Sequence, residues 1–128
     1  MKNLVNFVDF KIAKKLKDLG YNKPFFFFYR TDDKVIHHAM VNNPLVYGKN
    51  IDDEVIIAPT ISQVIQWLID EKKLYIYSKW LIDDTIKWGF QIDDLKTRRS
   101  TIYESHPKYK SCEEATLAGI EYVFNHLI

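Results

Sequence analysis

Carboxylates are the commonest side chains in this sequence that could do chemistry. Aspartates occur as four adjacent pairs, which are Asp32-Asp33, Asp52-Asp53, Asp83-Asp84 and Asp93-Asp94. Carboxylate oxygens are ligands of Ca²⁺ and Mg²⁺, but no pair has the spacing of a calcium-binding loop. Aspartate is also a common turn residue. We therefore interpret the pairs as turn residues at strand ends and expect no metal site.

The histidines and the single cysteine are the other candidates for chemistry. His37 and His38 are adjacent in a predicted strand, so their side chains point to opposite faces and cannot easily share a metal ion. His106 and His126 have no partner at metal-ligand spacing. Cys112 is followed by two glutamates, which disfavour a reactive thiolate.

No local motif supplies a catalytic site. The sequence lacks the phosphate-binding loop, the dinucleotide-binding glycine motif, the nucleophile-elbow motif and the zinc-protease motif. We expect no cofactor and a non-enzymatic protein. An enzyme with an unrecognised site, built from His37 or His38 and carboxylates, stays open as an alternative.

Three helices are predicted from their caps and apolar stripes. Asp9 caps the first, over Phe10–Leu19, and Gly20 ends it. Thr60 and Gln63 form a capping box for a second helix, whose apolar stripe runs from Ile61 to Ile69. A last helix follows Ser111, which forms a second capping box with Glu114.

Strands account for most of the remaining chain. The predicted ranges are 25–30, 35–40, 74–79, 85–92 and 100–104, with a further short strand suggested at 55–57. Residues 81–84 and 93–99 are predicted loops, and 41–55 is the longest irregular segment. The order is α-β-β-α-β-β-β-α. It predicts an α+β fold, one domain over 1–128, with three helices and a mainly antiparallel sheet of four to five strands.

Composition limits the classes of function. The 128 residues carry 18 basic and 17 acidic side chains, a net charge of +1, which gives no general argument for nucleic-acid or acidic-membrane binding. No apolar run approaches the roughly 20 residues that span a bilayer, and the N-terminus lacks the features of a signal peptide. One cysteine fits a reducing compartment. We expect a cytoplasmic protein that does not bind membranes.

Three segments resemble a group of small uncharacterised proteins. The segments are FKIAKKLKDLGYNKP, APTISQVIQWLIDEKKLYIY and CEEATLAGIEYVFNHLI, and the resemblance that they carry extends over most of the chain. The group occurs in Bacteroides-type gut bacteria and in their phages and mobile elements. Its shared motifs are caps, a glycine stop and apolar stripes, so the resemblance implies a fold and no chemistry. It also implies phage or mobile-element origin, with the host cytoplasm as the location.

Protein binding is the function that these observations favour. Tyrosine and tryptophan provide contact area at low entropic cost. The candidate anchors are the aromatic residues Trp67, Tyr75, Tyr77, Trp80 and Tyr103. The partner is another protein, and a second copy in a homodimer is one version of this hypothesis.

Nucleic-acid binding is the alternative from a different class. Cationic side chains are needed to contact backbone phosphates. The candidate positions are Lys14, Lys15, Lys96, Arg98, Arg99, Lys108 and Lys110. Against this reading, the last helix begins with Glu113 and Glu114, which repel phosphate.

Overall fold

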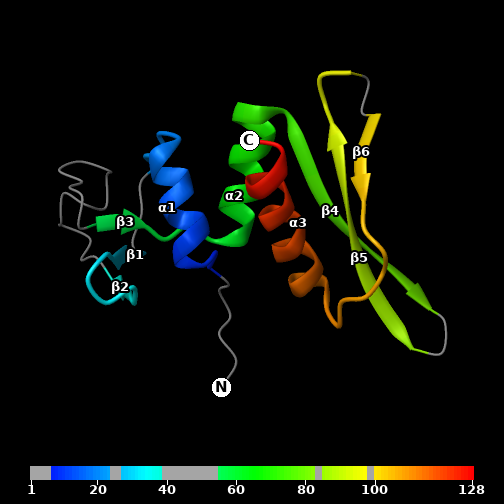
Figure 1. The fold of residues 1–128 in the computed structure, drawn as a ribbon, viewed down its shortest axis with the longest axis horizontal. Coiled ribbons are helices and arrows are strands. Elements are labelled where there is room, and N and C mark those ends of the chain that lie inside the picture. Colours follow the sequence, from blue (N-terminus) through cyan, green and yellow to red (C-terminus); the bar gives the residue numbers. More distant parts are fainter. Residues whose placement is uncertain (1–6, 24–26, 39–54, 83–84, 98–99) are drawn as a thin grey trace. The chain divides into compact units, whose positions relative to one another are not determined.

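The computed structural model describes residues 7–23, 27–38, 55–82, 85–97 and 100–128 (Figure 1). Contacts between residues divide the chain into two compact units. The N-terminal unit is Met1–Thr60 and the C-terminal unit is Ile61–Ile128. The assignment of the whole chain to one domain stays a prediction.

Helices and strands follow the predicted order. They are α1 (Phe10–Asp18), β1 (Phe27–Arg30), β2 (Ile36–His38), β3 (Val55–Ile57), α2 (Ile61–Trp67), η2 (Leu68–Lys72), β4 (Leu74–Ile82), β5 (Ile86–Asp94), β6 (Ser100–Glu104) and α3 (Cys112–His126). All described strand pairs are antiparallel, which confirms the α+β class. The described strands form two sheets of three, in the orders β2-β1-β3 and β4-β5-β6, where the sequence predicted one sheet of four to five.

The first helix begins and ends where the sequence predicts. The Asp9 carboxylate accepts a hydrogen bond from the Ile12 amide at 2.9 Å and caps the helix. Gly20 adopts a φ of 91°, and the Tyr21 amide bonds back to the Leu16 carbonyl at 2.9 Å. Buried side chains, including Leu16, line one face of α1, which packs on β3.

The first sheet completes the core of the N-terminal unit. β1 is its central strand and pairs with β2 and β3. Tyr29 of β1 is buried, and its hydroxyl donates to the Val8 carbonyl at 2.6 Å. The turn between β1 and β2 is predicted correctly, with Asp33 accepting from the Val35 amide. The predicted strand residues 25–26 and 39–40 and the irregular segment 41–54 lie outside the described residues.

The second helix is shorter than its apolar stripe predicts. α2 gives way at Leu68 to a wider π-helical turn, η2, which ends at Lys73 in a left-handed conformation with φ 56°. Trp67 and Leu68 are both buried.

Close packing joins α3 to the second sheet. The Ser111 hydroxyl accepts from the Glu114 amide at 3.1 Å, which confirms the predicted cap. Gly119 faces the sheet, and a Cβ at this position would lie 2.7 Å from Cγ2 of Ile76. The glycine therefore allows the helix to approach β4 closely. Figure 1 shows α3 running beside β4 within the C-terminal unit.

The β4–β5 hairpin is longer than predicted at both ends. Nine residue pairs join the two strands, from Leu74–Asp94 to Ile82–Ile86. The predicted turn over 81–84 is wrong at its start, because β4 continues to Ile82. The predicted loop over 93–99 is wrong at its start, because Asp93 is a buried strand residue whose carboxylate accepts from Gln91 at 2.9 Å.

Candidate functional site

The hairpin of β4 and β5 is longer than the helix that covers it. Nine residues at about 3.3 Å each give strands of roughly 30 Å. The fifteen residues of α3 at about 1.5 Å each give roughly 22 Å. α3 begins beside Ser78, where the Cys112 sulfur lies 2.8 Å from the serine hydroxyl. The hairpin therefore extends past the first turn of the helix (Figure 1).

Apolar side chains continue along this uncovered part of the hairpin. Ile76 and Phe90 lie on the face that α3 covers, and both are buried. Trp80 and Ile82 point to the same face at period two, but they are 53% and 67% exposed. Ile86, opposite Ile82, is 57% exposed. The face thus stays apolar after its cover ends.

One more exposed apolar residue lies on the opposite face. Leu81 is 59% exposed and is paired with Lys87. We refer to Trp80, Leu81, Ile82 and Ile86 as the hairpin-end cluster. Such a group of neighbouring exposed apolar side chains is uncommon unless it contacts another molecule.

A groove adjoins the cluster on the face of Leu81. Its volume is about 140 Å³, and Gly89 lines it. A Cβ at position 89 would lie 3.2 Å from the Ser105 hydroxyl and 3.3 Å from Cα of Pro107, so a side chain there would occupy the groove. A cavity of roughly 150 Å³ holds one benzene ring. The groove therefore has room for a single aromatic or branched side chain.

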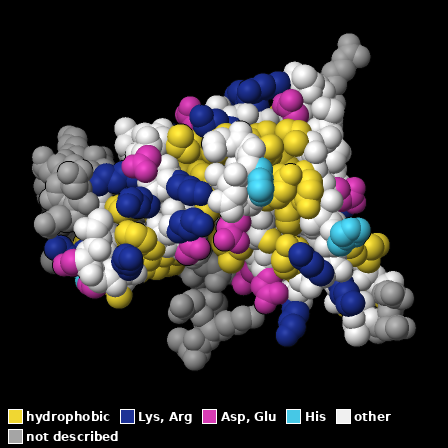
Figure 2. Space-filling view, in the orientation of Figure 1, with side chains coloured by type: hydrophobic (Ala, Val, Ile, Leu, Met, Phe, Trp, Pro, Cys, Tyr) yellow, Lys and Arg dark blue, Asp and Glu magenta, His cyan; other side chains and the backbone are white. Residues whose placement is uncertain are grey.

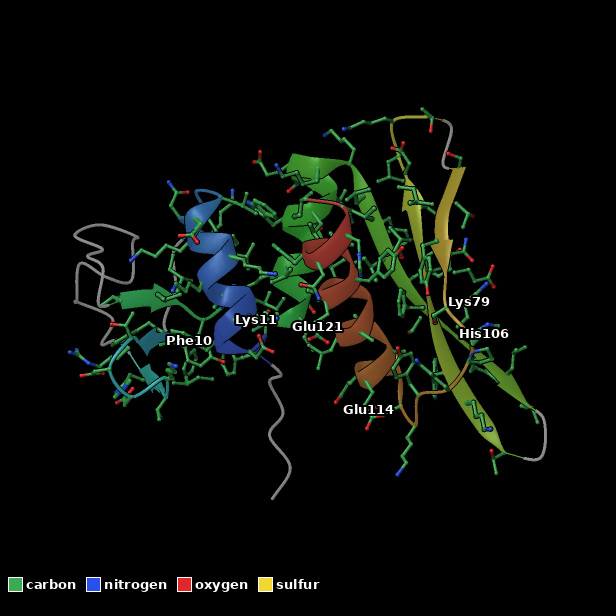
Figure 3. All side chains as sticks on the ribbon, viewed as in Figure 1. Phe10, Lys11, Lys79, His106, Glu114 and Glu121 are labelled. Carbon is green, nitrogen blue, oxygen red and sulfur yellow. The ribbon has the colours of Figure 1, made fainter. Side chains whose placement is uncertain are left out.

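Cationic side chains surround this end of the C-terminal unit. Lys79 borders the groove and donates to Glu104 at 2.5 Å and to Gln91 at 2.7 Å. Lys108 donates its backbone amide to the Trp88 carbonyl at 3.0 Å. Figure 3 shows Lys79 close to His106, and Figure 2 shows Lys and Arg side chains beside hydrophobic ones at this end of the unit. Because Lys79 is paired with Glu104, the groove combines apolar contact area with a neutral ion pair.

The predicted protein-binding residues do not form one surface. Trp67 is 7% exposed, so the expectation that it is accessible is wrong. Tyr75 and Tyr77 stack at 5.3 Å on the face of β4 opposite to Trp80. Tyr103 is 36% exposed but stacks on Tyr122 of α3 at 4.0 Å. Trp80 alone among the five belongs to the hairpin-end cluster.

Sequence reasoning missed the other three members of the cluster. The sequence predicts a turn at Leu81 and Ile82, and it predicts that Ile86 lies on the apolar face of a strand. The alternating pattern correctly predicts that Ile86 shares a face with Phe90. It does not show that α3 begins beside Ser78 and so does not cover Ile86. A comparison of the length of the last helix with the lengths of the hairpin strands could have predicted that the end of the hairpin is exposed.

The predicted nucleic-acid residues are distributed over several places. Lys14 and Lys15 belong to α1 in the N-terminal unit, and Arg98 and Arg99 lie outside the described residues. In the C-terminal unit, Lys96 follows the end of β5, whereas Lys108 and Lys110 are near its beginning. Eight residues of strand separate Trp88 from position 96, roughly 25 Å. Lys96 therefore does not join the lysines at the hairpin end.

The groups considered for metal or acid–base chemistry are exposed or engaged in structure. Among the described residues, no three His, Cys, Asp or Glu side chains are placed to hold a metal ion. The His37 ring hydrogen-bonds to Asp33 at 2.9 Å and stacks on Phe28. Of the described residues, Asp33 alone hydrogen-bonds to the His37 ring.

A second hollow of about 240 Å³ lies at the other end of the C-terminal unit. Its lining residues are Lys72, Leu74, Asp94, Lys96, Ile102, Leu127 and Ile128. Like the groove at Gly89, it is smaller than the roughly 300 Å³ at which small-molecule sites begin. Within the described ranges, no helix has both the length and the apolarity to cross a bilayer.

Relationships to known proteins add nothing to this description. No protein-family model, curated protein or solved structure matches the chain. The relationship to small proteins of Bacteroides-type bacteria and their phages therefore stays an expectation. The hairpin-end cluster is the candidate site on its own geometry.

Proposed function

We propose that this protein is a non-enzymatic binding module whose C-terminal unit holds another protein through the hairpin-end cluster. The observation that supports the proposal is the apolar face of the β4–β5 hairpin, which extends past α3 and exposes Trp80, Ile82 and Ile86 by more than half. Exposed apolar side chains cost free energy in water, and a partner that covers them recovers it.

The size of the cluster suits an anchor. Taking about 150–250 Å² for a fully exposed large side chain, its four residues expose roughly 450 Å². Functional patches on monomers are typically about 300–600 Å². Trp80 provides an indole of the kind that dominates binding energy in interfaces. The groove at Gly89 accepts one side chain of the partner, and the only charges among the described residues of its lining are the paired Lys79 and Glu104.

Photo-crosslinking tests the proposal at single positions. A photoreactive phenylalanine analogue replaces Ile82 in the cluster, and in a matched variant it replaces Glu121, an exposed residue of α3. Irradiation of expressing cells is followed by mass spectrometry of the products. We expect a defined protein adduct from position 82 and background alone from position 121.

Two outcomes of that experiment contradict the proposal. One is equal labelling from positions 82 and 121. The other is an adduct from position 82 that persists unchanged when Trp80 and Ile86 are both replaced by serine, because the cluster would then be unnecessary. Circular dichroism of the doubly substituted protein provides the control for folding.

The setting that we propose follows from the resemblance and from composition. The protein is encoded by a phage or mobile element of a Bacteroides-type bacterium and works in the host cytoplasm. Its single cysteine fits a reducing compartment. Gene neighbourhood tests the origin: phage or conjugation genes beside this one support it, and an isolated chromosomal metabolic operon contradicts it.

Nucleic-acid binding is the second candidate, and one observation favours it. Lys87, Lys108 and Lys110 belong to the segments that meet at Trp88, near the exposed Trp80. Cations combined with aromatic side chains bind single-stranded nucleic acid by phosphate contact and base stacking. Fluorescence anisotropy with a single-stranded oligonucleotide tests this at low and moderate salt. Three phosphate contacts predict a slope of log K against log salt of about −2, and absence of binding at low salt excludes this function.

A further inference from the structure

The backbone of β4 carries unpaired hydrogen-bonding groups along one edge. β4 pairs with β5 and is an edge strand of its sheet. On β5, Trp88 exchanges backbone hydrogen bonds with Tyr109, at 2.8 and 2.9 Å, so its N–H and C=O point away from β4. Trp80 is the residue opposite Trp88. In an antiparallel pair that is not hydrogen-bonded, the N–H and C=O groups of both residues point away from the partner strand. The N–H and C=O of Trp80 therefore point away from β5.

Along β4, the backbone N–H and C=O groups of every second residue point to the same edge of the strand. Because Trp80 directs its N–H and C=O to the free edge, Ser78 and Ile82 do so as well. Among the described residues, no backbone group bonds to this edge at these positions. Ile82 and Trp80 are exposed by more than half and Ser78 in part. Six main-chain groups are therefore available to an added strand.

The edge carries a single feature of the kind with which proteins block strand addition, the lysine at position 79, and this side chain is paired with Glu104. Residues 78–82, Ser-Lys-Trp-Leu-Ile, contain no proline and a single charge, at Lys79. The β-bulge in this sheet lies on the other side, between β5 and β6. Exposed sheet edges can bind extended segments by main-chain hydrogen bonding.

We propose that the occupant of this edge is a second copy of the chain. Residues 78–82 of the two copies pair antiparallel about a two-fold axis at Trp80, which joins two three-stranded sheets into one of six. This inference rests on the proposed function and names the partner of the same surface. The two Trp80 indoles then meet on the face that carries Ile82, and the apolar row across the strands becomes continuous.

The register follows from charge and from edge alternation. A two-fold axis at Lys79 would place Lys79 directly opposite its own copy, and like charges in that position are destabilising. An axis at Ser78 would bring Trp80 against Ile76, which is buried beneath the helices. An axis at Trp80 pairs Ser78 with Ile82 of the second copy and Lys79 with Leu81, and none of these residues is buried.

The small net charge of the chain permits a second copy to bind, and the small area limits its affinity. The chain carries a net charge of +1, so two copies repel each other little. The cluster offers roughly 450 Å² per copy, and covering both gives about 900 Å², below the roughly 1,200 Å² of standard stable interfaces. The dimer is therefore a reversible one that forms at micromolar concentrations or above.

Mixed disulfide formation tests the pairing and its register. Lys79→Cys and Leu81→Cys are made separately in a Cys112→Ser background. In the proposed dimer these residues form a non-hydrogen-bonded pair with Cα atoms about 4.5 Å apart, within the range for a disulfide. Under mild oxidation, we expect the mixture to form the heterodisulfide about tenfold or more faster than an unpaired control, because pairing raises the local thiol concentration.

The control replaces Leu81→Cys with Lys87→Cys, which lies on the same face and is equally exposed, but on β5. Equal rates for the two mixtures overturn the inference. Sedimentation velocity provides a second measurement on the unmodified chain. A weight-average mass that rises with concentration, and that falls in Trp80→Lys, supports the dimer, whereas a monomer at every concentration overturns it.

The experiments separate failure of the dimer from failure of the proposed protein-binding function. If position 82 photo-crosslinks to a protein of different mass while the sedimentation experiment shows only monomer, the second copy is excluded and the binding surface stands. If position 82 gives no adduct at all and the chain is monomeric, both fail.

Discussion

Replacing Gly119 by alanine should destabilise the C-terminal unit, although alanine is the better helix former. Alanine in place of glycine favours a helix by about 1 kcal/mol. The added Cβ, however, would lie 2.7 Å from Cγ2 of Ile76 and 3.2 Å from the ring of Phe90. The optimal separation of two carbons is about 3.5–4.0 Å, and overpacking of this kind costs about 1–3 kcal/mol. Ile76 is β-branched and 2% exposed, so it has little room to move.

We therefore expect the Gly119→Ala protein to lose up to about 2 kcal/mol of unfolding free energy, since an overpacking cost of up to about 3 kcal/mol is offset by about 1 kcal/mol of helix propensity. All three tryptophans lie in the C-terminal unit, so tryptophan fluorescence during denaturation with urea reports its unfolding. Glu121→Ala, at an exposed position of the same helix, is the control and should change stability by less than about 0.5 kcal/mol. A Gly119→Ala protein stabilised by about 1 kcal/mol would refute the reasoning, because helix propensity alone would then account for the effect.

Three further perturbations test other parts of the structure. Asp9→Ala removes the cap of α1 and should cost about 1 kcal/mol, measured as faster hydrogen exchange at residues 10–18 than in a Lys11→Ala control. Ile82→Lys should leave the unfolding free energy within about 0.5 kcal/mol of the parent, because Ile82 is 67% exposed. Ile76→Ala should lower it by about 2–5 kcal/mol, because Ile76 is 2% exposed. Equal losses would show that the hairpin end is part of the core. Burial, assisted by the Asp9 charge, raises the pKa of Tyr29, so its contribution to stability is complete below pH 10 and is lost as pH rises through the raised value. Tyr29→Phe should therefore be less stable than the parent at neutral pH by about 1 kcal/mol, with a difference that shrinks in alkaline denaturation experiments.

Local signals in the sequence predict most of the fold. A capping carboxylate at Asp9 and a glycine at position 20 mark the ends of α1 because both act within one turn of chain. Ser111 marks the start of α3 for the same reason. Strand β5 is predicted by alternation at period two, which depends on neighbouring residues alone. These features need no knowledge of distant contacts.

Features that depend on distant contacts are the ones that the sequence did not predict. The division of the strands between two sheets is set by which edges meet, and periodicity carries no information about that. Asp93 resembles a turn residue, yet Gln91 and Thr101 hydrogen-bond to it inside the sheet. The exposure of Ile82 and Ile86 depends on where α3 begins.

The candidate site was predicted only in part for the same reason. Trp80 was identified by residue type, because exposed tryptophan is a common interface residue. Trp67 has the same residue type but is buried, and composition cannot separate the two. The side-chain pattern also does not predict that β4 is an edge strand, because a strand with one paired edge and a strand with two can have the same alternation of side chains.

Amide hydrogen exchange along β4, followed residue by residue at two protein concentrations, tests the central claim most directly. In dilute solution the account predicts fast exchange at Ser78, Trp80 and Ile82, whose amides point to the free edge, and slow exchange at Lys79 and Leu81, whose amides bond to β5. At high concentration, protection should appear at the first three positions. Equal protection of all five amides in dilute solution, or alternation that does not change with concentration, would contradict it.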